Sequence, residues 1–306
     1  MKKFILIDGN AIIHRAFHAL PPFKTSKGEL VNAIYGFASI LLNILNNEKP
    51  DYIAVSFDMK GKTFRHEEYE DYKATRKKAP DELYDQIPRI KDLVKAFEIP
   101  IYEIQGFEAD DVLGTLAKQA EETPLLKTYI FTGDKDILQL VTEKTFAMMP
   151  SKGLSQPIIY DVQKVLGKLG LKPNQVPDMK GLEGDSSDNI KGVQGVGTKT
   201  ARALLQKYGT LENIYKNLDK ITGKVHEHLK KDEENAFFSR KLATIITDVP
   251  IKLSLNECRT HKYNRENVQN FFQELEFKTL LSRLNKFNSH SETKKKQEST
   301  AQQSLF

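Results

Sequence analysis

Short runs of β-branched and aromatic residues alternate with helical patterns through the first half of the chain. The strand-like runs lie at residues 3–7, 52–57 and 128–132. The helical patterns lie at residues 31–45, 82–97 and 109–121. In such a series each helix carries the chain back across the sheet, so the strands run mainly parallel. The sequence therefore predicts an α/β fold over residues 1–160, with a mainly parallel central sheet and flanking helices.

The pattern changes after about residue 160. Proline and glycine punctuation near Pro173 and Gly181 leads into a stretch with few strand signals and several helical ones. We expect a second, helical lobe over residues 161–287. Residues 288–306 are mostly Ser, Thr, Gln, Lys and Glu, which bury too little apolar surface to offset the ordering entropy of folding, so a disordered tail is expected there.

Composition excludes several classes of protein. The single cysteine, Cys258, rules out an intramolecular disulfide and a thiolate zinc cluster, and it favours a reducing, cytoplasmic location. The first apolar run ends at Asp8, too early for the core of a signal peptide. No stretch approaches the ~18–20 apolar residues of a membrane span. We therefore expect a soluble protein, monomeric and without a membrane partner.

The distribution of charge is more informative than the net charge of +5. Basic residues are concentrated in residues 60–78 and 191–207, whereas acidic residues recur singly after apolar runs. A negatively charged site flanked by positive surfaces suits an enzyme that acts on phosphodiesters through metal ions.

Acidic residues follow three of the predicted strands directly, at the sheet edge where open α/β folds bind ligands. Two further acidic groups lie at Glu108–Asp111 and Asp185–Asp188. A spacing of three puts Glu108 and Asp111 on one helix face, so both are expected to point into the same crevice. The candidate metal ligands are Asp8, Asp58, Glu108, Asp110, Asp111, Asp134, Asp136, Asp185 and Asp188.

Any one of these carboxylates, taken alone, is better explained as a helix cap or an Asx-turn. If they converge, their mutual repulsion requires cations. Ligands that are all oxygen select Mg²⁺ or Mn²⁺ over zinc. Two such ions about 4 Å apart can activate a water and stabilise the leaving oxygen of a phosphodiester, so at least two ions are predicted.

The segment from Met59 to Pro80 mixes basic and aromatic residues and has almost no aliphatic ones, so it is not expected in the core. Aromatic rings can stack on unpaired bases while Lys and Arg contact phosphates, which would hold a single strand regardless of its sequence. A solvated, charged surface helix is the competing interpretation.

A glycine-rich turn, Gly192 to Gly197, runs directly into a predicted helix that Thr198 would cap. Free N–H groups at such a helix start can bind a DNA phosphate without reading sequence. A phosphate-binding P-loop does not fit, because Thr198 stands where that motif requires lysine. A dinucleotide-binding fingerprint does not fit either, because the glycine order differs and no strand leads into the turn.

Four phrases, in their order and spacing, resemble the 5′-nuclease domain of bacterial DNA polymerase I and, more distantly, the flap endonucleases. They are TFRHEEYEDYKATRKKAP, FEADDVLGTLA, TGDKDILQLV and GLEGDSSDNIKGVQGVGTKTARALL. The resemblance runs from about residue 3 to residue 286 and implies a PIN-like nuclease core. By this resemblance Asp8, Asp58, Glu108, Asp110 and Asp111 belong mainly to a first metal cluster. Asp134, Asp136, Asp185 and Asp188 belong mainly to a second.

The resemblance also assigns the basic segment and the glycine turn. Residues 59–80 correspond to a helical arch over the active site, in which Lys73 and Arg76 would act as catalytic cations on the scissile phosphate, and the arch is expected to order on DNA. Residues 188–208 correspond to a helix-hairpin-helix that grips duplex DNA and often holds K⁺. The implied DNA-binding residues are Arg65, Tyr69, Tyr72, Lys73, Arg76, Gly195, Gly197, Thr198, Lys199 and Arg202.

The chain ends in Gln302-Gln303-Ser304-Leu305-Phe306, which resembles the Gln-x-x-Leu-Phe peptides that bind bacterial sliding clamps. In that pattern an otherwise disordered peptide buries its Leu and Phe in a pocket. Gln302, Leu305 and Phe306 are therefore expected to contact a sliding clamp, although a chance ending to a polar tail would look the same.

Together these features predict a 5′→3′ exonuclease and 5′ flap endonuclease that leaves a 5′-phosphate and a 3′-hydroxyl. Its substrate would be DNA with a 5′ flap, a nick or a 5′ end, and its task the removal of RNA primers and flaps in lagging-strand replication and repair. A haloacid-dehalogenase-type phosphatase is an alternative, but Asn10 stands where it needs a second aspartate. A non-catalytic DNA-binding module would have little use for nine carboxylates.

Overall fold

The computed structural model describes residues 1–151, 157–260 and 263–285, and it contains a sheet of six strands. In space the strands follow the order β3-β2-β1-β4-β5-β6, and every neighbouring pair is parallel except β5 and β6. Their bounds are β1 (Lys2–Asp8), β2 (Tyr52–Ser56), β3 (Ile101–Tyr102), β4 (Leu126–Phe131), β5 (Thr145–Met149) and β6 (Ile158–Tyr160). The expected mainly parallel sheet is confirmed.

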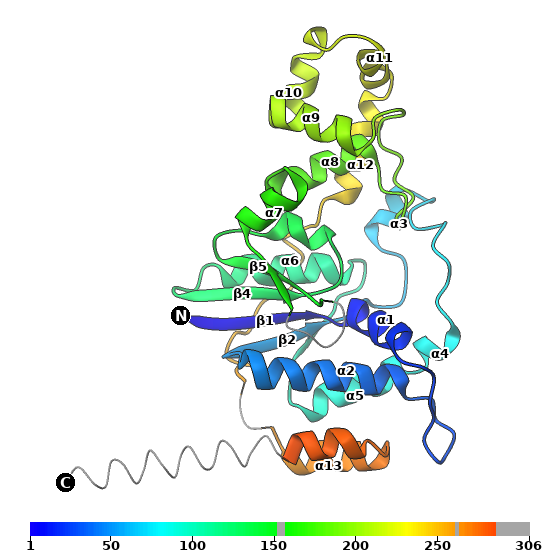
Figure 1. Ribbon diagram of the computed structural model, residues 1–306, viewed down its shortest axis with the longest axis vertical. Coiled ribbons are helices and arrows are strands. Elements are labelled where there is room, and N and C mark those ends of the chain that lie inside the picture. Colours follow the sequence, from blue (N-terminus) through cyan, green and yellow to red (C-terminus); the bar gives the residue numbers. More distant parts are fainter. Residues whose placement is uncertain (152–156, 261–262, 286–306) are drawn as a thin grey trace, which may run out of the picture.

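Helices cover both faces of the sheet (Figure 1). One face packs against α1 (Gly9–Ala19), α2 (Asn32–Asn43), α5 (Ile87–Ala96) and α13 (Arg265–Glu274), and the other against α6 (Ala109–Ala120). The alternation of side chains along a strand explains this division. In β1, Ile5 and Ile7 join the first cluster, whereas Phe4 and Leu6 join the second, and all four side chains are buried.

The strand order brings three carboxyl ends together. Because β1 lies between β2 and β4, the chain reverses its direction of travel across the sheet at β1, and such a switch point opens a crevice. Asp8 is the last residue of β1, Asp58 follows β2, and Asp134 follows β4. The three side chains therefore start from the same edge.

A helical lobe follows the sheet, beginning beside it at Val165, which packs in the cluster around α6, and rising to the top of Figure 1. Its elements are α7 (Val162–Leu169), η3 (Pro173–Gln175), α8 (Val176–Glu183), α9 (Thr198–Tyr208), α10 (Leu211–Lys216), η4 (Leu218–Lys220), α11 (Lys224–Lys231) and α12 (Glu233–Ala243). The lobe has its own core, in which Leu182, Leu205 and Leu229 are fully buried. At the α8–α12 contact a side chain on Gly181 would meet the carbonyl oxygen of Ala236 at 2.8 Å, so the two helices approach closely because this residue is glycine.

The prediction that residues 161–287 form one helical lobe is wrong for residues 245–260 and 263–285. After α12 the chain returns to the sheet, where Ile245 packs beside α6 and the carbonyl of Cys258 accepts a hydrogen bond from Ile53 N–H. The helix α13 then buries Phe272 in the cluster below the sheet. Helical periodicity shows which face of a helix is apolar but not which core that face packs against. Here the apolar face of α13 packs against one face of the sheet.

The segment expected to form a helical arch, residues 59–80, is only partly helical. It contains the single short helix α3 (Phe64–Glu68), and residues 70–75 are turns, followed by a bend at residue 76. The short helix α4 (Asp81–Tyr84) follows. In Figure 1 the segment rises beside the sheet edge toward the helical lobe. We refer to residues 59–80 as the arch segment.

No helix among the described residues is long and apolar enough to cross a membrane. The clamp-binding residues that the sequence suggests, Gln302, Leu305 and Phe306, lie outside the described residues.

Candidate active site

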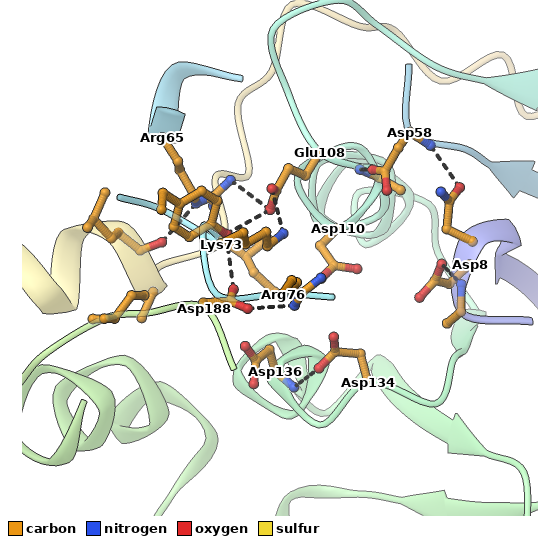
Figure 2. A pocket seen from close by; sticks show the side chains of 18 of the residues that line it. Asp8, Asp58, Arg65, Lys73, Arg76, Glu108, Asp110, Asp134, Asp136 and Asp188 are labelled. Carbon is orange, nitrogen blue, oxygen red and sulfur yellow. Dashed lines mark hydrogen bonds and ion pairs between the residues drawn. The ribbon is translucent and has the colours of Figure 1, made fainter. Parts of the chain in front are cut away.

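A cavity of about 260 Å³ lies at the carboxyl edge of the sheet, and most of the predicted carboxylates line it (Figure 2). Its walls come from the strand ends, the starts of α1 and α6, the arch segment, the loop that contains Asp188, and the chain that leaves the helical lobe at residues 242–245. Of the predicted site residues, those that line it are Asp8, Asp58, Arg65, Tyr72, Lys73, Arg76, Glu108, Asp110, Asp134, Asp136 and Asp188. Asp8 and Asp188, which are 180 positions apart in the sequence, thus line the same cavity.

Backbone groups fix the carboxylates at the strand ends. One oxygen of Asp8 accepts a hydrogen bond from the N–H of Ala11 at 2.9 Å, and the other accepts one from the hydroxyl of Thr132 at 2.6 Å. Asp58 accepts from the N–H of Ala109 at 2.7 Å, which ties the end of β2 to the first turn of α6. Asp8 is therefore both a helix cap and a wall of the cavity, since a capping carboxylate still has lone pairs to offer.

Asp110 occupies the centre of the negative charge. Its pKa is raised well above the ordinary value, chiefly by burial and then by the charges of Asp8 and Asp134, with Asp58 and Glu108 contributing. Burial also raises the pKa of Asp8 to about 6. Carboxylates this crowded ionise together only beside cations, and a set of oxygen ligands fits hard divalent ions.

A second group of carboxylates lies between the sheet and the helical lobe. One oxygen each from Asp136, Asp185 and Asp188 lie within 4.8 Å of one another, a spacing that suits a shared cation. Burial raises the pKa of Asp136 to about 6 although the ammonium of Lys180 opposes this. The structure thus has two adjoining acidic clusters. The second forms only when the helical lobe packs on the sheet, because Asp136 follows β4 whereas Asp185 and Asp188 follow α8.

Cations of the arch segment pair with both clusters. The ammonium of Lys73 lies 2.6 Å from Glu108, and the guanidinium of Arg76 lies 2.5 Å from Asp188. Lys73 has a left-handed backbone, with φ of 57°, and its N–H donates to the carbonyl of Asp188 at 3.0 Å. A left-handed lysine is a strained conformation of the kind that gathers at functional sites. The arch segment is therefore held over the cavity by the residues proposed to act there.

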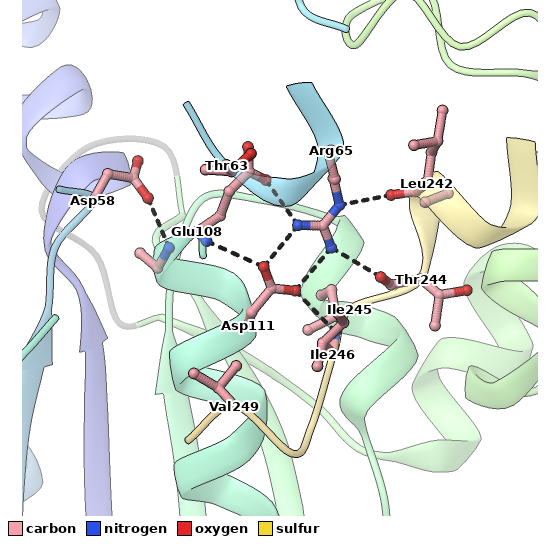
Figure 3. Close-up of polar contacts among 12 residues, drawn as sticks. Asp58, Thr63, Arg65, Glu108, Asp111, Leu242, Thr244, Ile245, Ile246 and Val249 are labelled. Carbon is pink, nitrogen blue, oxygen red and sulfur yellow. Dashed lines mark hydrogen bonds and ion pairs between the residues drawn. The ribbon is translucent and has the colours of Figure 1, made fainter. Parts of the chain in front are cut away.

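Asp111 and Arg65 depart from the sequence prediction (Figure 3). Asp111 does not line the cavity, and its two oxygens accept from the guanidinium of Arg65 at 2.7 and 2.8 Å. The same guanidinium donates to the carbonyl oxygens of Leu242 and Thr244, so Arg65 is only 2% exposed. The prediction that Asp111 points into the crevice is wrong. Arg65, which the resemblance implies as a DNA-binding residue, is buried and paired with Asp111 in this structure.

The tyrosines of the arch segment are also less available than predicted. Tyr72 is 4% exposed, and its hydroxyl lies 3.1 Å from both Glu108 and Asp188. Tyr69 packs edge-on against Phe238 of α12, with ring centroids 5.8 Å apart. The prediction that the segment stays out of the core is wrong for Tyr72, whose phenol hydroxyl is within hydrogen-bond distance of two carboxylates while its ring is buried.

The glycine turn packs closely on the C-terminal end of α8. Gly192 has φ of 64°, and a side chain there would lie 2.2 Å from the N atom of Gly184, so this position requires glycine. Beyond it Gly195, Gly197, Thr198 and Lys199 are exposed. Gly197, not Thr198, is the N-cap of α9, so the predicted capping role of Thr198 is wrong.

A second cavity connects the turn with the carboxylates. It has a volume of about 650 Å³, and Asp134, Asp136 and Asp185 line it together with Gly197 and Thr198. The predicted DNA-binding turn and the predicted metal site therefore share a wall. Arg202, further along α9, is only partly exposed and packs beside Gly170, where a side chain on that glycine would meet it at 3.0 Å.

Sequence reasoning missed several residues at the site. Asn10 accepts a hydrogen bond from the N–H of Asp58 at 2.9 Å, His14 lines the first cavity, and Lys180 pairs with Asp136 and Asp185. Asn10 lies two residues after Asp8 and Lys180 lies five before Asp185, so proximity in sequence was the available signal. The groups that these residues contact, however, depend on the folded structure and could not be predicted from that proximity.

The raised carboxylate pKa values predict a pH dependence of the metal-free protein. Groups whose pKa is raised in the folded state favour folding when protonated, so their stabilisation is complete near pH 3.8 and is lost as the pH rises through about 6. In EDTA, urea denaturation should give a free energy of unfolding that falls by roughly 1–3 kcal/mol over this range. Asp8→Asn should flatten the profile, and stability that rises over the same range would contradict the prediction.

The chain matches family models along most of its length. Residues 3–170 match the model described as 5′-3′ exonuclease, N-terminal resolvase-like domain, and residues 171–266 match the one described as 5′-3′ exonuclease, C-terminal SAM fold. Over 284 residues the chain is 46% identical to DNA polymerase I of Caldicellulosiruptor bescii, covering 92% of this chain and 33% of that protein. It is 44% identical to DNA polymerase I of Bacillus subtilis over 292 residues, covering 95% and 33%. The chain thus spans about a third of the length of these relatives.

Solved structures share the fold at low sequence identity. T5 5′-exonuclease, in a structure titled as having divalent metal ions (zinc) bound, is 19% identical with a TM-score of 0.66, and the match covers 94% of this chain and 99% of that one. Flap endonuclease-1 from Methanococcus jannaschii is 17% identical with a TM-score of 0.59, covering 93% and 91%. The catalytic core of Rad2, in a complex with DNA substrate, is 16% identical with a TM-score of 0.60, covering 92% and 93%.

Proposed function

The chain belongs to the 5′-3′ exonuclease family, and on that premise we propose that it is a 5′→3′ exonuclease and structure-specific 5′ flap endonuclease acting on DNA. The observation that carries the proposal is the crowding of carboxylates at the sheet edge, with Asp110 at the centre and cations of the arch segment above it. A phosphodiester is the substrate that such a site suits, because metal ions would neutralise the acids and the arch cations would face the phosphate.

The cleavage chemistry divides between bound ions and the side chains of the chain. Two Mg²⁺ or Mn²⁺ ions would supply charge neutralisation and lower the pKa of a water for attack. Asp8, Asp58, Glu108 and Asp110 would hold ions at the first cluster. Asp134, which the resemblance assigns to the second cluster, lines both cavities and raises the pKa of Asp110, so it could contribute to either. Asp136, Asp185 and Asp188 would hold ions at the second cluster, and Asp111 would act through Arg65 by holding the start of α6.

The two arch cations would then act on the substrate. Lys73 and Arg76 lie within ion-pair distance of Glu108 and Asp188, so both reach the cavity. As negative charge builds on the scissile phosphate, cations already in position stabilise it without reorganisation. Hydrolysis would leave a 5′-phosphate and a 3′-hydroxyl.

Duplex DNA would be held by the glycine turn. The exposed residues Gly195, Gly197, Thr198 and Lys199 are suited to phosphate contacts that do not read sequence. We also propose that a K⁺ ion binds at this turn and that Arg202 is a cation near the bound DNA. The open cavity between the turn and the carboxylates would let a strand pass from one to the other.

We place this activity in the removal of RNA primers and 5′ flaps during lagging-strand replication and repair, in the cytoplasm and as a monomer. The sequence of the tail supports a sliding clamp as a partner, through Gln302, Leu305 and Phe306. A tail that binds a clamp would raise the effective concentration of the nuclease at the replication fork.

The test is cleavage of a duplex with a 5′-labelled flap by the wild-type chain, with product sizes read on a gel. With Mg²⁺ or Mn²⁺ we expect release of the flap near the junction, and none in EDTA. The remaining nick should be sealed by a DNA ligase, which requires a 5′-phosphate and a 3′-hydroxyl. A folded protein that binds DNA without cutting it in either ion would favour a non-catalytic module, and release of phosphate from a small ester would favour a phosphatase.

Substitution of Lys73 tests the role of the arch cations. Lys73→Gln should slow single-turnover cleavage by about 10²–10³, the loss typical of a preorganised group that stabilises developing charge. DNA affinity, measured by anisotropy in Ca²⁺, should change far less. Lys77→Gln is the matched control, because Lys77 is an exposed cation of the same segment. Equal losses in the two variants would mean that the segment contributes only general positive charge.

A further inference from the structure

Lys180 lies inside the second carboxylate cluster. It is a residue of α8, its side chain is 13% exposed, and its ammonium donates hydrogen bonds to both Asp136 and Asp185. These two aspartates come from different parts of the fold, one after β4 and one after α8. Lys180 therefore bridges the sheet to the helical lobe through the acids of the cluster.

The ammonium of Lys180 bonds two of the carboxylates that a shared divalent ion would need. Among the described residues, Asp136, Asp185 and Asp188 form the group whose oxygens lie close enough to share one ion. Lys180 pairs with two of them, and Arg76 pairs with the third. An ammonium and a divalent ion compete for these carboxylates, because both are attracted by the same oxygens and repel each other.

The surroundings of Lys180 leave room for it to move. Its side chain lines the second cavity, which continues past Asp185 to Gly197 and Thr198 at the start of α9. A lysine side chain has four flexible methylenes, so its ammonium can leave the acids without a change in the backbone. The cavity leads to the turn where a DNA phosphate would bind, and that phosphate would attract the displaced charge.

We propose that Lys180 is a displaceable counter-ion that competes with the divalent ion at the second cluster. This inference rests on the proposed function, because that function supplies the ion. Lys180 stabilises the folded protein while the cluster holds no ion, and it keeps the affinity of the cluster low in the absence of DNA. A bound substrate phosphate adds negative charge and accepts the ammonium, so the second ion binds when substrate is present.

The experiment measures Mn²⁺ binding to the DNA-free protein by electron paramagnetic resonance, for the wild type and for Lys180→Met. Removal of the competing charge should tighten the weaker class of sites by about tenfold and leave the tighter class nearly unchanged. Lys135→Met is the matched control. Lys135 is an exposed cation between Asp134 and Asp136 in sequence, and its loss should change either affinity by less than about twofold.

A melting experiment separates the inference from a folding defect. In EDTA, Lys180→Met should melt below the wild type, because Asp136 and Asp185 then repel each other, and Mn²⁺ should raise its melting temperature more than that of the wild type. Unchanged or weaker Mn²⁺ binding in Lys180→Met, with a normal fold, would overturn the inference and leave the proposed function intact. A wild-type protein that binds no Mn²⁺ at all would overturn both.

Discussion

Replacement of Asp110 by asparagine is expected to reduce flap cleavage by at least about a thousandfold while leaving the protein folded. Asp110 lies among Asp8, Asp58, Glu108 and Asp134, which all raise its pKa. Asparagine keeps the shape of the side chain and removes the charge that would hold an ion at the centre of the first cluster. Single-turnover cleavage in Mg²⁺, with enzyme in excess over a labelled flap duplex, measures this effect.

The same substitution should raise the stability of the folded protein although it lowers cleavage. A carboxyl whose folded-state pKa is raised is destabilising when ionised, so Asp110→Asn should unfold at a higher urea concentration than the wild type at pH 8 in EDTA. Asp85→Asn, an exposed acid beyond the arch segment, is the control and should change neither property. Cleavage that survives Asp110→Asn, or that is lost in parallel with DNA binding, would mean that Asp110 is not a metal ligand.

The second prediction concerns Arg65, whose substitution should produce the largest loss of stability. Arg65→Met should lower the free energy of unfolding by about 3–5 kcal/mol, the loss typical when one partner of a buried ion pair is removed. The reason is that Asp111 has no exposed surface and accepts two hydrogen bonds from this guanidinium. The carbonyls of Leu242 and Thr244 would lose their donors at the same time.

A double-mutant cycle identifies the cause of that loss. Because Asp111→Asn removes the charge that Arg65→Met leaves uncompensated, the double variant should recover part of the stability lost in Arg65→Met. Lys77→Met controls for the loss of a cation from the same segment and should stay within about 0.5 kcal/mol of the wild type. A loss below about 1 kcal/mol for Arg65→Met would show that the pair is not structurally important. These values come from urea denaturation at a fixed pH.

The Arg65 pair also has a functional consequence. It connects the arch segment, the start of α6 and the chain leaving α12, so it fixes the places from which Lys73 and Glu108 extend. Arg65→Lys keeps the charge but loses the planar fork that binds Asp111 and two carbonyls together. Cleavage should therefore fall in Arg65→Lys more than DNA binding does, although Arg65 itself is buried.

The class of fold and the edge of the sheet at which the site lies can both be predicted from the amino-acid sequence. Both depend on local patterns: strand-like runs are short and continuous, and Asp8, Asp58 and Asp134 follow them directly. A residue at the carboxyl end of a parallel strand lies at the same edge as its neighbours whatever the rest of the chain does. For that reason the mainly parallel sheet and the convergence of these three acids could be predicted.

Which of two adjacent acids faces the cavity, and which group each charge contacts, could not be predicted without the folded structure. Asp110 and Asp111 differ by about 100° around α6, so one points into the cavity and the other toward Arg65. The packing of residues 245–260 and 263–285 on the sheet and the pairing of Lys180 with Asp136 were likewise not predictable from the sequence. The physical reason is that burial and ion pairing depend on contacts between distant segments, whereas periodicity records only which face of an element is apolar.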